Sequence, residues 1–251
     1  MCRHLAYVGP PVRLGELLVE PPHALVRQAW APRRQTHGVM NVDGFGVGWY
    51  VPGDPSPARH RGVGPVWADE TFADLARVVS STAFLAALRS ATEGMAHGPA
   101  ASAPFRHGRW LFSHNGAIRD WDTAVARLAA DLDPARLARL EVSTDSALLW
   151  VMVTQALDAG DDPADALTGA VRRARDAGGE RLNLLLTDGT AIWATAFGAS
   201  LVTRQHAGGG AGGPGGVVVA SEPYDDEPGW ADVPDDSLVV ATAGDLRITR
   251  L

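Results

Sequence analysis

Cysteine is almost absent from this sequence, because its 251 residues include only one, at position 2. A single thiol excludes an internal disulfide framework and any multi-cysteine metal site. Free cysteine is often just a small buried hydrophobic residue, and this interpretation stays open for Cys2 when only the residue type is considered. Any cysteine chemistry in this chain must act through that one side chain.

The sequence also lacks a surplus of positive charge and a long apolar segment. Its 22 Lys and Arg residues are outnumbered by 29 Asp and Glu residues, and no basic run is present that could follow a phosphate backbone. No apolar run reaches the roughly 18 residues of a membrane span. Arg3, Pro10 and Pro11 interrupt the apolar stretch that a signal peptide needs. We therefore expect a cytoplasmic protein that binds neither nucleic acid nor membrane.

Motifs for metals and phosphates are missing as well. The eight histidines include no helical His-x-x-x-His pair and no carboxylate spacing typical of metal ligation. The glycine tract at residues 207–216 lacks the Lys and Ser/Thr of a P-loop, so it indicates a flexible excursion of the chain. We expect no metal and no cofactor.

Hydrophobic periodicity divides the chain into strands, then helices, then strands again. Residues 52–65 are rich in Pro, Gly and Arg and are predicted to form an exposed loop. Without a clear interdomain linker, this order predicts one α+β domain over residues 2–251. The predicted strands are 3–8, 44–51, 109–114, 182–187, 191–197, 217–221 and 238–242, and the predicted helices are most of 70–88 with 123–140, 146–157 and 164–177.

The position of Cys2 gives its thiol a specific chemistry. An initiator methionine is generally removed before a small side chain, so we expect Met1 to be cleaved and Cys2 to carry a free α-amine. An α-amine has a pKa of roughly 7.7 to 8.0 and a thiol about 8.5, so the neutral amine can accept the thiol proton near neutral pH. Cys2 would then supply both the nucleophile and the base.

A thiol that attacks an amide carbonyl creates an oxyanion, which must be met by hydrogen-bond donors. Asn115 and Gly116 follow the predicted strand at 109–114, and the pair Asn-Gly favours a turn with positive φ. The side-chain amide of Asn115 and the backbone N–H of Gly116 are therefore candidate donors. The alternative is a plain turn without a catalytic role.

Five segments together resemble the class II, or N-terminal nucleophile, glutamine amidotransferase-like family. Cys2 stands at the start, residues 43–46 (Asp-Gly-Phe-Gly) resemble the family's Asp-x-x-Gly segment, and residues 89–92 (Arg-Ser-Ala-Thr) resemble its Arg-x-Ala-Thr segment. Residues 114–116 match its His-Asn-Gly signature, and residues 144–146 (Thr-Asp-Ser) resemble its Ser-Asp-Thr/Ser segment. The resemblance implies a four-layer αββα sandwich in which Cys2 is the nucleophile.

The resemblance also implies roles for the remaining motif residues. Asn115 and Gly116 would form the oxyanion hole. Arg89 would hold the α-carboxylate of a small-molecule γ-glutamyl substrate in a bidentate pair, Thr92 would add a hydroxyl hydrogen bond, and Asp145 would receive the α-ammonium. Judged from the residues alone, Arg89 also fits a solvated helix position and Asp145 a helix N-cap.

Departures from the better-known amidotransferases fall on the leaving-group side. Those enzymes carry an aromatic residue, a histidine and an arginine where this chain has Ser90, Glu93 and Met40. The length is about that of the hydrolase domain alone, which predicts a stand-alone hydrolase. Segments at 2–5, 20–23, 28–32 and 43–50 resemble the branch of the family that releases glutamate from a γ-glutamyl amide in ergothioneine biosynthesis.

Several alternatives remain open at this point. A glutaminase subunit would donate ammonia to a separate synthase, another hydrolase would cleave a different γ-glutamyl amide, and an acylase would prefer an apolar acyl group. A non-enzymatic interaction protein would not need the removal of Met1. The substrate implied by the resemblance has a leaving group with a trimethylammonium, which aromatic faces can hold. Trp30 and Trp49 are the candidates, although tryptophan is more often a core residue.

Overall fold

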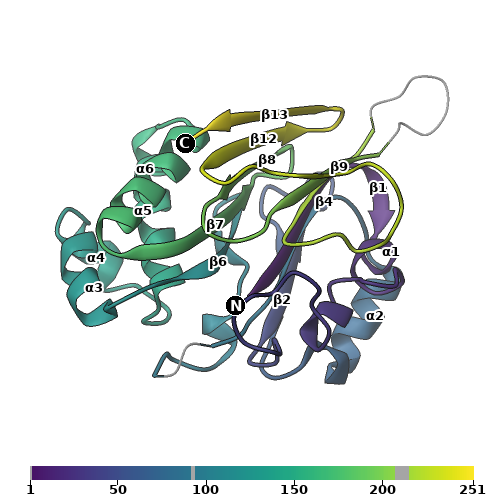
Figure 1. The fold of residues 1–251 in the computed structure, drawn as a ribbon, viewed down its shortest axis with the longest axis horizontal. Coiled ribbons are helices and arrows are strands. Elements are labelled where there is room, and N and C mark those ends of the chain that lie inside the picture. The colour runs from purple at the N-terminus through teal and green to yellow at the C-terminus, as the bar shows by residue number, and fades with distance from the viewer. Residues whose placement is uncertain (1, 92–93, 207–214) are drawn as a thin grey trace.

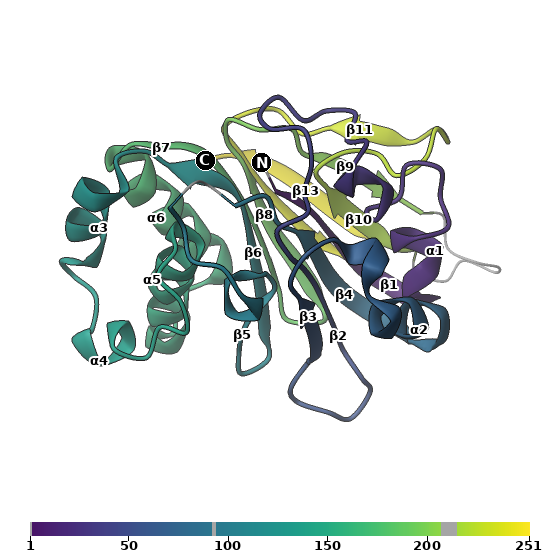
Figure 2. The ribbon, with the colours of Figure 1, turned by 90° about the horizontal axis from the view of Figure 1, so that it is seen from below.

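Two antiparallel β-sheets lie between two layers of helices, as Figure 1 and Figure 2 show. The computed structural model describes residues 2–91, 94–206 and 215–251. The arrangement confirms the four-layer αββα sandwich that the resemblance implied. Within the described part of the chain, no helix is both long enough and apolar enough to cross a membrane.

The first sheet has seven strands in the order β11-β9-β10-β1-β4-β2-β3. These strands are β1 (Arg3–Arg13), β2 (Phe45–Trp49), β3 (Ala58–Gly62), β4 (Ser80–Leu88), β9 (Val202–Gln205), β10 (Val217–Ala220) and β11 (Trp230–Asp232). Strand β1 is paired antiparallel on both edges, with β10 and with β4, and Arg3 lies opposite Leu88. The beginning of the chain is therefore held inside a sheet.

The second sheet has six strands in the order β13-β12-β8-β7-β6-β5. These strands are β5 (Phe105–His107), β6 (Trp110–Ile118), β7 (Gly179–Thr187), β8 (Ala191–Ala196), β12 (Ser237–Thr242) and β13 (Asp245–Arg250). The β7–β8 hairpin confirms the predicted pairing across Asp188-Gly189. Strand β6 pairs along almost its whole length with β7.

Helices cover the outer face of each sheet. The helices are α1 (Leu14–Leu18) and α2 (Glu70–Val78) on the seven-stranded sheet, and α3 (Trp121–Ala129), α4 (Pro134–Leu137), α5 (Asp145–Ala159) and α6 (Pro163–Asp176) beside the six-stranded sheet. The period-2 alternation of β1 sends Leu5 and Tyr7 toward α1 and α2, whereas Ala6 and Val8 pack between the sheets. Each sheet thus separates two hydrophobic cores.

Several segments differ from the sequence prediction, and the predicted helix at 123–140 is divided into α3 and α4. The predicted helix over most of residues 70–88 is only half correct, because α2 ends at Val78 and residues 80–88 form β4. Strand β4 is buried on both faces between β1 and β2, and its run of Ala, Phe and Leu does not alternate with polar residues. The predicted loop at 52–65 is wrong at its centre, where β3 pairs with β2.

Asn115 and Gly116 lie within β6 and do not form the predicted turn. They pair with Asn183 and Leu182 of β7. A Cβ atom on Gly116 would lie 1.8 Å from the carbonyl oxygen of Arg181. Glycine is therefore required here by close backbone approach and not by a positive φ. The short strands β5, β9 and β11 and the strand β13 were not predicted, and residues 207–214 of the predicted excursion lie outside the described residues.

A buried ion pair anchors the start of β1. The guanidinium of Arg3 lies 3.7 Å from the carboxylate of Glu222, and both side chains are fully buried. Burial lowers the pKa of Arg3, and the charge of Glu222 opposes this shift. The carboxylate of Glu222 also accepts hydrogen bonds from the backbone N–H groups of Arg33 and Arg34, at 2.9 and 2.8 Å. This carboxylate therefore joins three segments of the chain.

We expect Glu222→Ala to lower the free energy of unfolding by about 3 to 5 kcal/mol, because it leaves the Arg3 charge buried without its partner. Urea unfolding followed by circular dichroism measures the change. The matched control is Asp74→Ala, which removes an exposed ion pair with Arg77 and should cost about 0 to 1 kcal/mol. Equal effects of the two substitutions would contradict the anchoring role.

Candidate active site

Cys2 immediately precedes β1 and lines a small cavity between the two sheets and the start of α5. Its side chain is half-buried, and its Sγ lies 3.8 Å from the carbonyl oxygen of Ser90, which accepts from the thiol. The cavity is lined by Cys2, Arg89, Ser90, Ala91, Met95, Ala101, Gly116, Thr144, Asp145 and Ser146. The structure therefore brings four of the predicted site residues, Cys2, Arg89, Gly116 and Asp145, to one place.

Arg89 follows directly after β4 and is almost fully buried. Its Nη2 donates to the carbonyl oxygen of Ala96 at 2.8 Å, whereas its Nη1 is buried and has no hydrogen-bond partner. This arrangement excludes the alternative of a solvated helix position. A buried cation with an unused donor beside the thiol can receive an anionic group.

The Asp-Gly segment at residues 43–44 holds the backbone around Arg89. The N–H of Arg89 donates to the carbonyl of Gly44 at 2.8 Å, and the N–H of Asp43 donates to the carbonyl of Arg89 at 3.0 Å. The carboxylate of Asp43 accepts from the N–H of Ala91 at 2.7 Å. Gly44 has a φ of +144°, and a Cβ atom there would lie 2.2 Å from the hydroxyl of Ser102. This motif therefore shapes the cavity wall without lining the cavity.

Gly116 lines the cavity, while Asn115 lies behind it. The Asn115 side chain is fully buried, and its Nδ2 donates to the hydroxyl of Ser221 over a long 3.4 Å. The same hydroxyl accepts from the N–H of His4 at 3.0 Å. Asn115 is thus connected through Ser221 to β1, the strand that begins immediately after Cys2.

Asp145 is the first residue of α5 and is half-buried at the cavity. The N-cap is Thr144, whose hydroxyl accepts from the N–H of Ala147 at 3.1 Å, so the N-cap alternative for Asp145 is wrong. One carboxylate oxygen of Asp145 accepts from the N–H of Ser146 at 2.7 Å. The other accepts from the N–H of Ile118 at 3.3 Å, which leaves a carboxylate facing the cavity with capacity for a further donor.

Two histidines lie near the site. His114 donates from Nε2 to the carbonyl of Arg181 at 3.2 Å, and its Nδ1 lies 3.0 Å from the hydroxyl of Ser146. Burial lowers the pKa of His4 to about 3, assisted by the charges of Arg3 and His114. His4 is therefore neutral at physiological pH.

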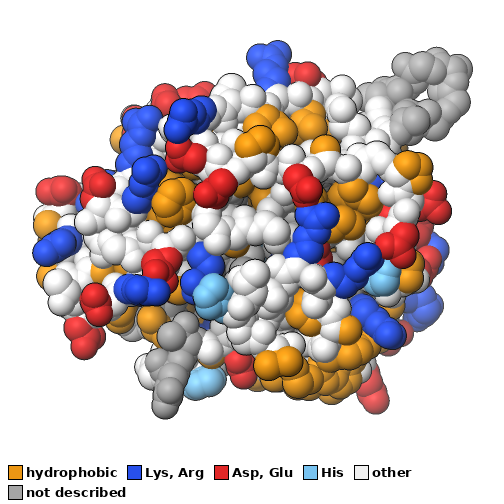
Figure 3. All heavy atoms as spheres, viewed as in Figure 1, with side chains coloured by type: hydrophobic (Ala, Val, Ile, Leu, Met, Phe, Trp, Pro, Cys, Tyr) orange, Lys and Arg blue, Asp and Glu red, His pale blue; other side chains and the backbone are white. Residues whose placement is uncertain are grey.

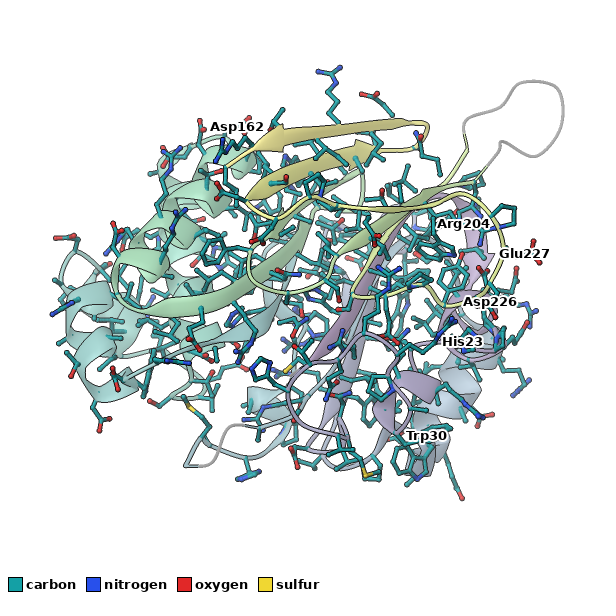
Figure 4. All side chains as sticks on the ribbon, in the orientation of Figure 1. His23, Trp30, Asp162, Arg204, Asp226 and Glu227 are labelled. Atoms are coloured by element: carbon teal, nitrogen blue, oxygen red, sulfur yellow. The ribbon has the colours of Figure 1, made fainter. Side chains whose placement is uncertain are left out.

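Trp30 and Trp49 are not among the residues that line this cavity. Thr92 lies outside the described residues. Trp49 is the last residue of β2, four residues from Phe45, and packs against the core beneath α1 and α2. Trp30 is 39% exposed, and its ring contacts Trp67 edge-on and the guanidinium of Arg27. Figure 4 shows Trp30 to the lower right of the amino-terminus marked in Figure 1.

Sequence reasoning missed Ser90, Met95 and Ser221. Ser90 contributes a backbone carbonyl, which no side-chain pattern reveals, and Met95 comes from the segment that follows the arginine motif. Ser221 ends the predicted strand at 217–221, and its N–H donates to the carbonyl of His4 at 2.9 Å. A polar residue at the end of an apolar strand was the available signal for Ser221.

Among the described residues, no group of three or more His, Cys, Asp or Glu side chains is placed to hold a metal ion. Figure 3 shows positive and negative side chains interspersed over the face that carries the amino-terminus. All 22 basic residues of the chain are arginine, so the sequence contains no lysine.

Comparison with known proteins agrees with this geometry. The family model described as "Glutamine amidotransferases class-II" matches residues 23–208. The chain is 40% identical to the gamma-glutamyl-hercynylcysteine sulfoxide hydrolase of Mycolicibacterium smegmatis, over the full length of both proteins. It is 39% identical to the enzyme of the same name from Mycobacterium tuberculosis, covering all of this chain and 97% of the relative.

A solved structure supports the same fold. The glutamine aminotransferase class-II domain protein from Silicibacter pomeroyi superposes with a TM-score of 0.70 at 24% identity, covering 99% of each chain. A likeness at this identity shows the fold alone, but the family model and the full-length relatives show more. This chain belongs to the class II glutamine amidotransferase family.

Proposed function

We propose that this protein hydrolyses the γ-glutamyl amide of γ-glutamyl-hercynylcysteine sulfoxide, releasing glutamate and hercynylcysteine sulfoxide. The observation that carries the proposal is the cavity in which Cys2, Arg89 and Asp145 meet. Full-length similarity to hydrolases named for this substrate supports the choice of leaving group. Glutamine is the alternative substrate, because it has the same glutamyl head.

The charges of the cavity match the amino-acid end of a γ-glutamyl group. The unpartnered Nη1 of Arg89 and its charge suit an α-carboxylate, and the half-buried carboxylate of Asp145 suits an α-ammonium. Charge-assisted hydrogen bonds of this kind are about twice as strong as neutral ones. An opposed pair selects a free amino-acid head and disfavours an apolar acyl group.

Cys2 then performs the chemistry. Its α-amine, free once Met1 is removed, accepts the thiol proton, and Sγ attacks the amide carbon. The C–N bond breaks, the leaving amine takes the proton, and glutamate remains bound to Cys2 as a thioester. Water, deprotonated by the same α-amine, attacks the thioester carbon and releases glutamate and the thiol. His4 is a weak base for either step, because burial lowers its pKa to about 3.

Gly116 and Asn115 are proposed to stabilise the oxyanion. Gly116 lines the cavity, so its backbone is close to the reacting carbonyl. The 3.4 Å contact of Asn115 with Ser221 is long for a hydrogen bond, which leaves the Asn115 amide free to turn to a stronger acceptor. Each such donor is typically worth about 3 to 4 kcal/mol in the transition state.

The trimethylammonium of the leaving group has no N–H to donate, so an aromatic face is the appropriate partner. Trp30 is the better of the two candidates, because it is partly exposed whereas Trp49 packs against the core. The loop that follows Trp30 contacts the residue next to the nucleophile, through the 3.2 Å hydrogen bond from Arg3 to Gln35. Binding there would require the cation to replace Arg27 at the Trp30 ring.

We expect Cys2→Ala to release no measurable glutamate and to keep its melting temperature, since the bond that the Cys2 side chain makes to Ser90 is weak. Intact mass should show that Met1 is absent from the wild type. A glutamine-like diazoketone should form one adduct, on Cys2. Labelling at another residue, or activity retained in Cys2→Ala, would refute the nucleophile assignment.

Arg89→Lys should lower kcat/KM by about 10- to 150-fold, because an ammonium cannot reproduce the two-pronged contact and the loss of one charged hydrogen bond costs about 1.5 to 3 kcal/mol. Initial rates of glutamate release measure this loss. The matched control is Arg77→Lys on the exposed side of α2, which should behave like the wild type. Near-normal efficiency of Arg89→Ala would show that the glutamyl head binds elsewhere.

Leaving-group recognition is tested with three substrates: γ-glutamyl-hercynylcysteine sulfoxide, its analogue without N-methyl groups, and glutamine. The wild type should bind the trimethylated substrate about 2- to 30-fold more tightly than the unmethylated one, as expected for a cation–π contact. Trp30→Ala should no longer distinguish the two, while Trp67→Ala serves as the neighbouring aromatic control. Faster cleavage of glutamine than of the other substrates would favour a glutaminase instead.

A further inference from the structure

A second cavity of about 390 Å³ lies away from Cys2, between helices α4 and α5 and strands β3 and β5. Figure 2 shows α5 beside β5, with β3 beyond it. This cavity shares no lining residue with the one at Cys2. Residues 141–144 separate the two, because Glu141 and Val142 line the second cavity while Thr144 lines the first.

The second cavity has an apolar wall of aromatic and aliphatic side chains. Phe105 and Trp150 are buried members of the core beneath α5, and both also line the cavity. Trp150 stacks on Phe112 with the ring centroids 5.0 Å apart and the planes 14° from parallel. Val151 and Leu140 continue the wall. A flat apolar group has a matching surface here.

Arginine side chains surround this apolar wall. Arg59 donates to the carbonyl of Pro104 at 3.1 Å and Arg106 to that of Pro57 at 2.9 Å. Arg139 is exposed at the rim. Within the described part of the chain, none of Arg59, Arg106 and Arg139 has a carboxylate within ion-pair distance.

The carboxylates of the cavity are already engaged. Asp158 pairs with Arg136 at 2.8 Å and with His107 at 3.0 Å. Glu141 pairs with Arg61 at 3.1 Å, and Asp133 accepts from the N–H of Ala135 at the start of α4. Four arginines and three carboxylates line the cavity, so its lining carries an excess of one positive charge.

Burial and repulsion between the arginines disfavour the charged form of Arg59. Burial, together with the charges of Arg61 and Arg106, lowers the pKa of Arg59 to about 10, while Glu141 opposes this shift. A bound anion would relieve this repulsion. Guanidinium groups are suited to carboxylate and phosphate, because their planar donors match both geometries.

We propose that this cavity is a binding site for an organic anion that combines a flat aromatic body with a carboxylate or phosphate group. The aromatic body packs on Phe105 and Trp150, and the anionic group pairs with Arg59, Arg106 and Arg139. The site is independent of the hydrolysis at Cys2, since the two cavities have separate linings.

Isothermal titration calorimetry with benzoate and with phenyl phosphate tests the proposal and tells which anionic group is preferred. We expect at least one of these probes to bind the wild type and to bind Arg59→Gln and Arg139→Gln about tenfold more weakly, as expected when one charged contact is lost. Arg139 is exposed, so its replacement leaves the fold intact even if that of Arg59 does not. Arg247→Gln, on the exposed strand β13, is the matched control and should bind like the wild type.

Two further measurements complete the test. Benzyl alcohol, which has the aromatic body without the charge, should bind much more weakly than benzoate. Cys2→Ala should bind the aromatic anions as the wild type does, because Cys2 is not part of this cavity. Absence of binding by both aromatic anions, or unchanged affinity in Arg139→Gln, would overturn the proposal whatever the outcome of the hydrolysis assays.

Discussion

The pairing of β1 on both of its edges is the constraint on which the site depends. Arg3 is opposite Leu88, and the peptide groups of His4 are bonded to Ser221, so the backbone is fixed within one or two residues of the thiol. A terminal residue is ordinarily mobile unless a sheet or a helix holds it. Here the pairing of β1 supplies this order and positions Cys2.

The remaining site residues reach Cys2 because the strands end at the same place. Arg89 follows β4, the neighbour of β1, and the Asp43 segment enters β2, the neighbour of β4. Gly116 comes from the opposite sheet and Asp145 from the helix packed on that sheet. Segments more than a hundred residues apart thus form one wall. Arg89 and Asp145 bring positive and negative charge to the same cavity from separate elements.

The sequence predicted the layers and most of the site, but it did not predict how some of its elements are used. The order of the motifs correctly predicted that Cys2, Arg89 and Asp145 lie at one cavity. The sequence of β4 was predicted to be helical, because a strand buried on both faces lacks the alternation of apolar and polar residues. Gly116 was predicted to lie in a turn, because the pair Asn-Gly favours a turn wherever it occurs. In the structure glycine is required there because the carbonyl oxygen of Arg181 leaves no room for a Cβ atom. Tertiary packing decides that Trp49 points into the core, and this direction cannot be read from the sequence.

The absence of lysine makes the half-buried Cys2 a selective site for chemical labelling. In a chain whose only cations are arginine and histidine, the α-amino group is the one aliphatic primary amine. In the proposed mature chain, the only thiol is on the same residue. Reagents selective for a 1,2-aminothiol, such as aldehydes that form a thiazolidine ring, would therefore react at a single residue of this chain. Dyes and surface tethers could be attached there with defined stoichiometry.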